Sequence, residues 1–180
     1  MSARPASRWV VVKFGGTSVS TLANWRNIAL VVHRRQQSGY KVLVVHSAIT
    51  KITDMLEKLL AAAQAGNPDE ALKAIEDRHR QLTTDLGVGV SAQLQGYFDE
   101  LRQMANGIAL VRELSDRTRA RVMANGELMA TEIGSRFLKS APRGFATFGC
   151  SRLRANAPVH FVEDAVVVGV VFRFGQELFV

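Results

Sequence analysis

Two short apolar runs, separated by a segment with helical periodicity, constrain the fold of this chain most strongly. Residues 9–14 are rich in valine and end at Gly15 and Gly16, which is typical of a buried strand followed by a flexible turn. Residues 41–46 form a second run of the same kind. Between them, over residues 22–37, apolar side chains recur at helical spacing. This order of strand, helix and strand favours parallel pairing with a right-handed crossover.

Helical patterns dominate the next part of the chain, over residues 53–65, 69–86, 91–114 and 115–138. The two apolar runs are almost continuous, as expected where helices cover both faces of a sheet. We therefore predict an α/β fold, a three-layer αβα sandwich with a mainly parallel sheet. In open sheets of this kind, ligands bind beyond the carboxyl ends of the strands.

The character of the sequence changes at residue 139. Residues 139–180 are rich in phenylalanine and valine and lack a clean period. We interpret this tail as a frameshifted or divergent end, and the chain as truncated. A second reading frame that continues the earlier pattern would support this hypothesis.

The composition suits a single α/β domain, since 47% of the 180 residues are apolar. Cys150 is the single cysteine, so no disulfide can form within the chain, and a reducing cytoplasm is the favoured compartment. No apolar stretch is long enough to cross a bilayer, and we predict no membrane partner.

The charge balance raises nucleic acid as a partner, because 23 lysines and arginines face 16 acidic residues, a net charge of +7. The densest basic cluster, Arg117, Arg119 and Arg121, has no interleaved aromatic side chains for base stacking. A solvated helix face is the favoured interpretation, and we predict no nucleic-acid partner. A steep loss of binding with salt would indicate the opposite.

The residues that follow the first strand favour binding of an anion. Gly15 and Gly16 let backbone N–H groups approach a phosphate, and the start of the next helix adds a positive dipole. Lys13 adds a full charge, and Thr17 and Ser18 add hydroxyl groups. The alternative is an ordinary turn with a surface lysine. Candidate N-caps for the next helix are Thr17, Ser18 and Ser20.

Two further segments carry candidate site residues. The turn after the second strand contains Ser47, and in a parallel sheet it opens on the same edge as the first turn. Its other interpretation is helix capping by Thr50 or Thr53. Gly126 lies inside a helical pattern, where glycine costs about 1 kcal/mol, and this indicates close packing or a ligand next to Glu127. The four histidines lack the spacing of a metal site, so we predict no metal ligands.

Taken together, these segments resemble the aspartokinase branch of the amino acid kinase family. Residues 13–19 match its K-F-G-G-T-S-V signature letter for letter. Residues 44–48, followed by Thr53 and Asp54, resemble its V-V-x-S-A segment, and residues 112–115 with 126–128 resemble its G-E segment. The sequence also resembles aspartate kinases that are fused to diaminopimelate decarboxylase. The resemblance assigns residues 1–138 to the N-terminal part of an amino acid kinase domain.

The resemblance implies transfer of the γ-phosphoryl group of ATP, with Mg²⁺, to the β-carboxylate of L-aspartate, giving 4-phospho-L-aspartate for lysine, threonine and methionine biosynthesis. Lys13 would be catalytic and would neutralise the transferring group. Thr53 and Glu127 would hold the aspartate. A homo-oligomer is implied for the full-length family. The implied ATP- and phosphate-binding residues are Lys13, Gly15, Gly16, Thr17, Ser18 and Ser47.

The sequence also departs from the family pattern. Thr50 and Lys51 stand where many members have glycine, and a bulkier loop would narrow the cleft. The family's second half, with its nucleotide-base site, is not recognisable after residue 138. The alternative to an active kinase is therefore a catalytically incomplete fragment, acting at most as an anion- or subunit-binding module.

Overall fold

The computed structural model describes residues 8–140 and the backbone of four later strands. Its main sheet has the strand order β1-β2-β4-β3, built from β1 (Arg8–Phe14), β2 (Tyr40–His46), β3 (Val159–Val162) and β4 (Ala165–Gly169). β1 and β4 both pair parallel to β2, and β3 pairs antiparallel to β4. β5 (Arg173–Phe174) and β6 (Glu177–Leu178) form a separate antiparallel pair. The predicted α/β fold with a mainly parallel sheet is confirmed, and β3 and β4 come from the tail.

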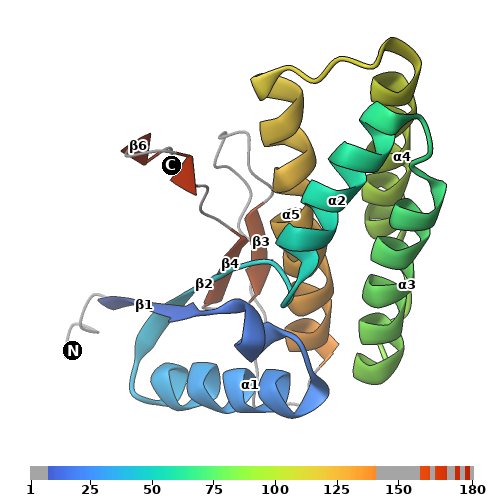
Figure 1. Ribbon diagram of the computed structural model, residues 1–180. Coiled ribbons are helices and arrows are strands. Elements are labelled where there is room, and N and C mark those ends of the chain that lie inside the picture. Colours follow the sequence, from blue (N-terminus) through green and yellow to red (C-terminus); the bar gives the residue numbers. More distant parts are fainter. Residues whose placement is uncertain (1–7, 141–158, 163–164, 170–172, 175–176, 179–180) are drawn as a thin grey trace, which may run out of the picture.

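The helices that the structure describes agree closely with the periodic segments of the sequence. α1 contacts β2, whereas α5 contacts β3 and β4 (Figure 1). The other helices pack against α5 and against one another beside the sheet. None of the helices described is long and apolar enough to cross a membrane. The helices are α1 (Leu22–Gln37), α2 (Ile52–Ala65), α3 (Asp69–Leu86), α4 (Ala92–Val111) and α5 (Asp116–Ser140).

Trp25 joins the first helix to the rest of the core. Its side chain is 0% exposed, and its indole N–H donates to the carbonyl of Val19 at 2.9 Å. The ring meets His46 of β2 edge-on at 5.6 Å between centroids and Phe137 of α5 at 6.3 Å. A Cβ on Gly134 of α5 would lie 2.0 Å from this ring. Glycine at this position is therefore what lets α5 approach α1.

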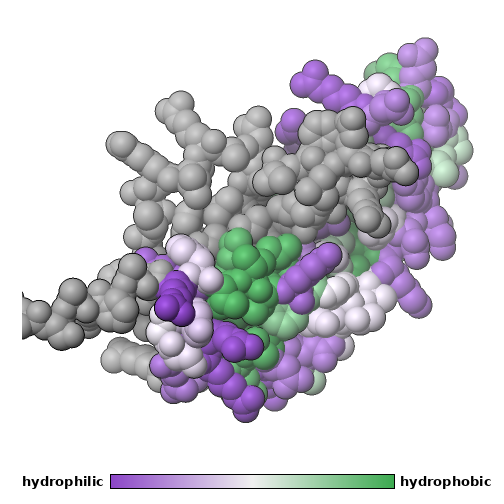
Figure 2. Space-filling model, turned by 90° about the vertical axis from the view of Figure 1, so that its left-hand side faces the viewer, coloured by the Kyte–Doolittle hydropathy of each residue, from purple (hydrophilic) through white to green (hydrophobic). Residues whose placement is uncertain are grey.

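The prediction that the first strand is buried on both faces is wrong. Val10, Val12 and Phe14 pack against the core, but Trp9 is 56% exposed and Val11 60% exposed. The reason is that the face of β1 that carries Trp9 and Val11 is not covered by the described helices and meets solvent. The space-filling view shows hydrophobic surface exposed between hydrophilic side chains on one side of the molecule (Figure 2).

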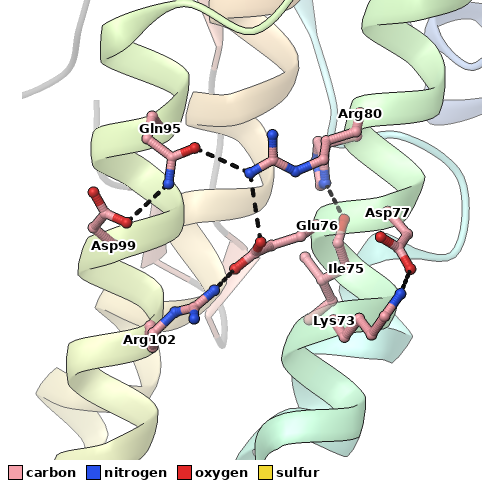
Figure 3. Close-up of polar contacts among 9 residues, drawn as sticks. Lys73, Ile75, Glu76, Asp77, Arg80, Gln95, Asp99 and Arg102 are labelled. Atoms are coloured by element: carbon pink, nitrogen blue, oxygen red, sulfur yellow. Dashed lines mark hydrogen bonds and ion pairs between the residues drawn. The ribbon is translucent and has the colours of Figure 1, made fainter.

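A polar network joins α3 to α4 on the outside of the helical layer (Figure 3). Glu76 forms ion pairs with Arg80, at 3.7 Å, and with Arg102. Arg80 also donates to Gln95 at 3.0 Å, and Gln95 donates to Asp99 at 2.9 Å. Two arginines of the predicted basic cluster also form ion pairs between helices. Arg119 pairs with Glu57, and Arg121 pairs with Glu100.

Candidate functional site

The carboxyl ends of β1 and β2 lie side by side. Lys13 is in register with Val45, and Phe14 with His46. The backbone N–H of Ser47 donates to the carbonyl of Phe14 at 3.3 Å, which continues the pairing by one residue. The two loops that carry most of the predicted site residues therefore leave the same edge of the sheet, as the sequence predicted.

The loop after β1 leaves its backbone open to a ligand. Lys13, Gly15 and Thr17 are all exposed. A Cβ built on Gly15 would have no atom within 4 Å, so space surrounds this part of the backbone. The N–H of Ser18 donates to the carbonyl of Gly15 at 3.0 Å and closes a tight turn. This exposed ammonium beside an open glycine backbone suits an anionic group such as a phosphate.

The predicted bounds of the first helix are confirmed, but a short helical turn that the sequence did not predict comes before it. A single 3-10 turn, Gly16–Val19, follows Gly15, and α1 begins only at Leu22. The N-cap of α1 is Thr21, whose hydroxyl accepts from the N–H of Asn24 at 3.3 Å. None of the three predicted N-caps has this role. The inserted turn leaves the hydroxyl groups of Thr17 and Ser18 on the loop itself.

Gly16 and Ser20 fasten the first loop to the second. A Cβ on Gly16 would lie 2.7 Å from the carbonyl oxygen of Ala48, so only glycine allows this approach. The hydroxyl of Ser20 donates to the carbonyl of Gly16 at 2.5 Å and accepts from the N–H of Thr50 at 3.0 Å. Arg78 of α3 donates to the carbonyl of Ser20 at 3.1 Å. The two loops are thus held as one unit.

The loop after β2 does not cap α2 with a side chain. The hydroxyl of Thr50 lies 3.0 Å from that of Ser20 instead. Lys51 occupies the N-cap position with φ of 71°, in the left-handed region, and makes no side-chain cap. Thr53 lies exposed in the first turn of α2. Capping by Thr50 or Thr53 is therefore wrong, and the backbone at Lys51 has the conformation that favours glycine.

Gly126 of α5 packs closely against the loop after β2 and the start of α2, and this places Glu127 beside that loop. A Cβ on Gly126 would meet side-chain carbons of Ile52, Leu56 and Ala48 at 3.1 to 3.2 Å. This confirms close packing as the reason for a glycine inside the helix. The carboxyl group of Glu127 accepts a hydrogen bond from the backbone of Ala48.

The Glu127 carboxyl is poised to change charge near neutral pH. Burial raises its pKa from 4.5 to about 7, and hydrogen bonds from the backbone at Glu127 and Ala48 oppose this shift only in part. His46, at the end of β2, is held neutral, because burial lowers its pKa. Its ring lies 2.9 Å from the carbonyl of Ser47 and supports the start of the loop.

The structure therefore gathers most of the predicted residues around two loops and one helix. Lys13 and Ser47 lie at neighbouring strand ends, and Glu127 contacts the second loop at Ala48. Thr53 follows Ile52, which packs on Gly126. Sequence patterns missed Ser20 and Arg78 as supports, because their contacts span 30 and 58 residues of chain.

Neither a cluster of metal ligands nor the described groove coincides with this site. Among the described residues, no group of three or more histidine, cysteine or acidic side chains is placed to hold a metal ion. A divalent cation at these loops would have to be held mainly by phosphate oxygens, as Mg²⁺ often is. A groove of about 660 Å³ lies elsewhere, between α1, the end of α3 and the end of α5, and includes none of the predicted site residues.

Comparison with known proteins identifies the family. The model of the amino acid kinase family matches residues 8–147. This chain belongs to that family. The tail beyond residue 147 is outside the match, and the origin predicted for residues 139–180 stays a prediction.

The relatives narrow the resemblance to aspartokinases. Aspartokinase 1, chloroplastic, of Arabidopsis thaliana is 31% identical over 136 residues, which cover 72% of this chain and 23% of the relative. The aspartokinase of Schizosaccharomyces pombe is 33% identical over 150 residues, covering 75% and 28%. The crystal structure of E. coli aspartokinase III in complex with aspartate and ADP has a TM-score of 0.60 at 25% identity, covering 73% of this chain and 29% of that one.

These matches confirm the resemblance to the N-terminal portion of aspartokinases that the sequence motifs indicated. The chain spans only 23% to 29% of the length of these relatives. Fused relatives include a bifunctional aspartokinase/homoserine dehydrogenase of Arabidopsis thaliana, 31% identical over 132 residues. The resemblance to enzymes fused to diaminopimelate decarboxylase stays a prediction.

Proposed function

We propose that this chain acts as an aspartate kinase, in which the loops after β1 and β2 bind phosphate and Glu127 binds aspartate. The reaction transfers the γ-phosphoryl group of ATP to the β-carboxylate of L-aspartate. A carboxylate oxygen forms a bond to the γ-phosphorus while the bond between that phosphorus and ADP breaks, giving 4-phospho-L-aspartate and ADP. The observation that carries the proposal is the exposed Lys13 beside the open backbone of Gly15. The loop after β1, which follows Lys13, is hydrogen-bonded to the loop after β2, and that second loop contacts Glu127.

The proposed roles follow from charge and position. Lys13 neutralises charge on the transferring group, and the N–H groups of Gly15 and Gly16 bind phosphate oxygens, with the hydroxyls of Thr17, Ser18 and Ser47 alongside. Such a transfer needs no nucleophilic side chain, because positioning and charge stabilisation account for most of the rate. Mg²⁺, bound through the phosphates, would supply further positive charge.

Glu127, with Thr53, is proposed to hold the aspartate substrate. An ammonium group next to Glu127 favours the ionised carboxylate and lowers its raised pKa. Binding of the substrate amine is therefore coupled to loss of the Glu127 proton, and it strengthens as pH rises toward 7. The cytoplasmic location and the homo-oligomer stay predictions that accompany this proposal.

A coupled assay of ADP release by the purified chain tests the proposal. We expect release that depends on both aspartate and MgATP and that is lost in Lys13→Ala. Lys58→Ala, which removes an exposed lysine of α2, is the matched control and keeps the rate. Turnover that is indifferent to Lys13 contradicts the assignment.

A second candidate is a module that binds an anion or another subunit without turnover, because the exposed Lys13 beside the open Gly15 backbone suits a phosphate group whether or not it is transferred. A folded chain without turnover, but with ADP affinity that depends on Lys13, would support this candidate in place of the active kinase.

A further inference from the structure

The side chain of Asn24 is hydrogen-bonded to the loop after β1. Its amide nitrogen Nδ2 donates to the carbonyl oxygen of Thr17 at 2.7 Å. Asn24 lies in the first turn of α1, three residues after the N-cap Thr21, so a regular helix fixes the point from which this side chain reaches the loop. Its backbone N–H donates to the Thr21 hydroxyl, and its side chain is thereby left for the loop.

Other carbonyl groups of the same turn are held by side chains from the interior of the protein. These hydrogen bonds are buried or partly buried, so the core fixes this side of the loop. They run from Ser20 to Gly16 at 2.5 Å, from Trp25 to Val19 at 2.9 Å and from Arg78 to Ser20 at 3.1 Å. The bond from Asn24 to Thr17 differs from them, because it is exposed and lies on the outer part of the loop.

We propose that Asn24 is a positioning residue for the phosphate site, and that its bond to Thr17 keeps the loop in the conformation that binds phosphate. The inference rests on the proposed function, in which Thr17 and Ser18 lie along the phosphate groups. The C=O of Thr17 and the N–H of Ser18 belong to one planar peptide unit. Asn24 holds the C=O end of this unit, and its N–H end donates to the carbonyl of Gly15 at 3.0 Å.

The expected effect is on the population of the ordered loop. When only a fraction of the chains has the binding conformation, the apparent dissociation constant rises by the inverse of that fraction. A hydrogen bond between neutral groups shifts such an equilibrium by up to about tenfold. Loss of the Asn24 side chain is therefore expected to weaken ADP binding by about threefold to tenfold.

The chemistry of Asn24 separates this role from that of Lys13. Asparagine is uncharged, so its loss leaves the electrostatic attraction of the phosphates as it was. Alanine is a better helix former than asparagine, which offsets the loss of one exposed hydrogen bond. Asn24→Ala is therefore expected to shift the midpoint of thermal unfolding by less than about 2 °C. Weaker binding by a protein of unchanged stability is the mark of a positioning residue.

Isothermal titration calorimetry with ADP and Mg²⁺ tests the inference. Asn27→Ala is the matched control, because Asn27 is an exposed asparagine one turn further along α1, and it is expected to keep the wild-type affinity. Equal affinities of Asn24→Ala and Asn27→Ala overturn the inference. If Lys13→Ala weakens binding in the same experiment, the proposed phosphate site still stands. If Lys13→Ala binds like the wild type, or the folded wild type does not bind, the proposed site fails as well.

Hydrogen exchange of the Ser18 N–H provides a readout that does not depend on turnover. In the free chain, Asn24→Ala is expected to raise the exchange rate of this N–H at least about threefold, because the turn opens more often. Saturating ADP is expected to restore the wild-type rate, since the ligand selects the ordered loop. A purely structural role of Asn24 does not predict this recovery, and its absence overturns the inference.

Asn24→Asp keeps the test decisive if Asn24→Ala does not fold. An acidic side chain in the first turn stabilises a helix, whereas a carboxylate cannot donate to the carbonyl of Thr17. This variant is expected to be at least as stable as the wild type and yet to exchange the Ser18 N–H faster in the free chain. A wild-type exchange rate in Asn24→Asp overturns the inference.

Discussion

The hydroxyl oxygen of Ser20 lies 3.0 Å from the backbone nitrogen of Thr50, and this contact fastens together the loops that follow β1 and β2. The same hydroxyl donates to the carbonyl of Gly16. Ser20 itself is 9% exposed, so water does not readily replace it. Ser20, which lies just outside the family signature of residues 13–19, thus stabilises the loop that carries this signature.

Replacing Ser20 by alanine is expected to destabilise the protein by about 1–3 kcal/mol, because the N–H of Thr50 loses its partner in a partly buried place. Urea unfolding followed by circular dichroism measures this change. Ser38→Ala removes an exposed hydroxyl that bonds the carbonyl of Arg34, and it is expected to change stability by less than about 0.5 kcal/mol. If both variants change the free energy of unfolding equally, the contact between the two loops does not contribute more to stability than an exposed hydrogen bond.

A pair of glycine variants tests the close approach of the loops. Gly16→Ala is expected to cost about 1–3 kcal/mol, because its Cβ would lie 2.7 Å from the carbonyl oxygen of Ala48. Gly15→Ala should be nearly neutral, since Gly15 has φ of −78° and no atom within 4 Å of an added Cβ. Thermal unfolding of both variants gives the comparison. A larger loss for Gly15→Ala would contradict the described packing.

Most of the fold was predictable from local patterns, and the exceptions have physical reasons. Residues 22–37 and 69–86 were assigned to helices with the observed bounds, because their apolar spacing and the glycines that follow act locally. The valines of residues 9–14 predicted a strand but not its exposed face. An apolar run carries no information on which faces of the strand the helices cover.

The site was predictable in its parts but not in its assembly. Lys13 and Gly15 could be named as candidates because residues 13–19 match the family signature, whereas the glycine pair alone also fits an ordinary turn, and their roles stay predictions. The N-cap Thr21 was missed because an extra 3-10 turn precedes α1. Contacts such as Arg78 to Ser20 join distant elements, and no local pattern indicates them.

The raised pKa of Glu127 makes stability depend on pH in a defined direction. A group with a folded pKa above its unfolded value stabilises the protein at low pH, and this stability is lost as pH rises. Between pH 4.5 and about 7 the loss is expected to reach about 3 kcal/mol. Unfolding free energies measured across this window report the sum of this loss and of an opposite gain from His46 and His79, because burial lowers the pKa of both histidines and so favours the folded state as pH rises.

Two variants assign that decline to Glu127. Glu127→Gln cannot ionise, so its unfolding free energy should rise more steeply with pH than that of the wild type, by about 3 kcal/mol between pH 4.5 and about 7. Glu113→Gln changes an exposed glutamate between α4 and α5, and it should keep the wild-type slope. A wild-type slope in Glu127→Gln would assign the pH dependence to other groups.

Lys51 is expected to be a position where a substitution stabilises the protein. Its φ of 71° costs a residue with a side chain about 1 kcal/mol, so Lys51→Gly should gain up to that amount. Lys58→Gly, inside α2, should instead lose about 1 kcal/mol. Chemical denaturation of the two variants gives the opposite signs that the backbone geometry predicts. Loss of stability in Lys51→Gly would show that the lysine side chain compensates for the conformation.

Binding of ADP in the presence of Mg²⁺, measured by isothermal titration calorimetry, tests most directly the claim that the loop after β1 binds phosphate. We expect the wild type and Lys58→Ala to bind alike. Lys13→Ala should bind at least about tenfold more weakly, because a hydrogen bond to a charged group contributes about 1.5–3 kcal/mol. Equal affinity in Lys13→Ala, or no binding by the folded wild type, would contradict the account.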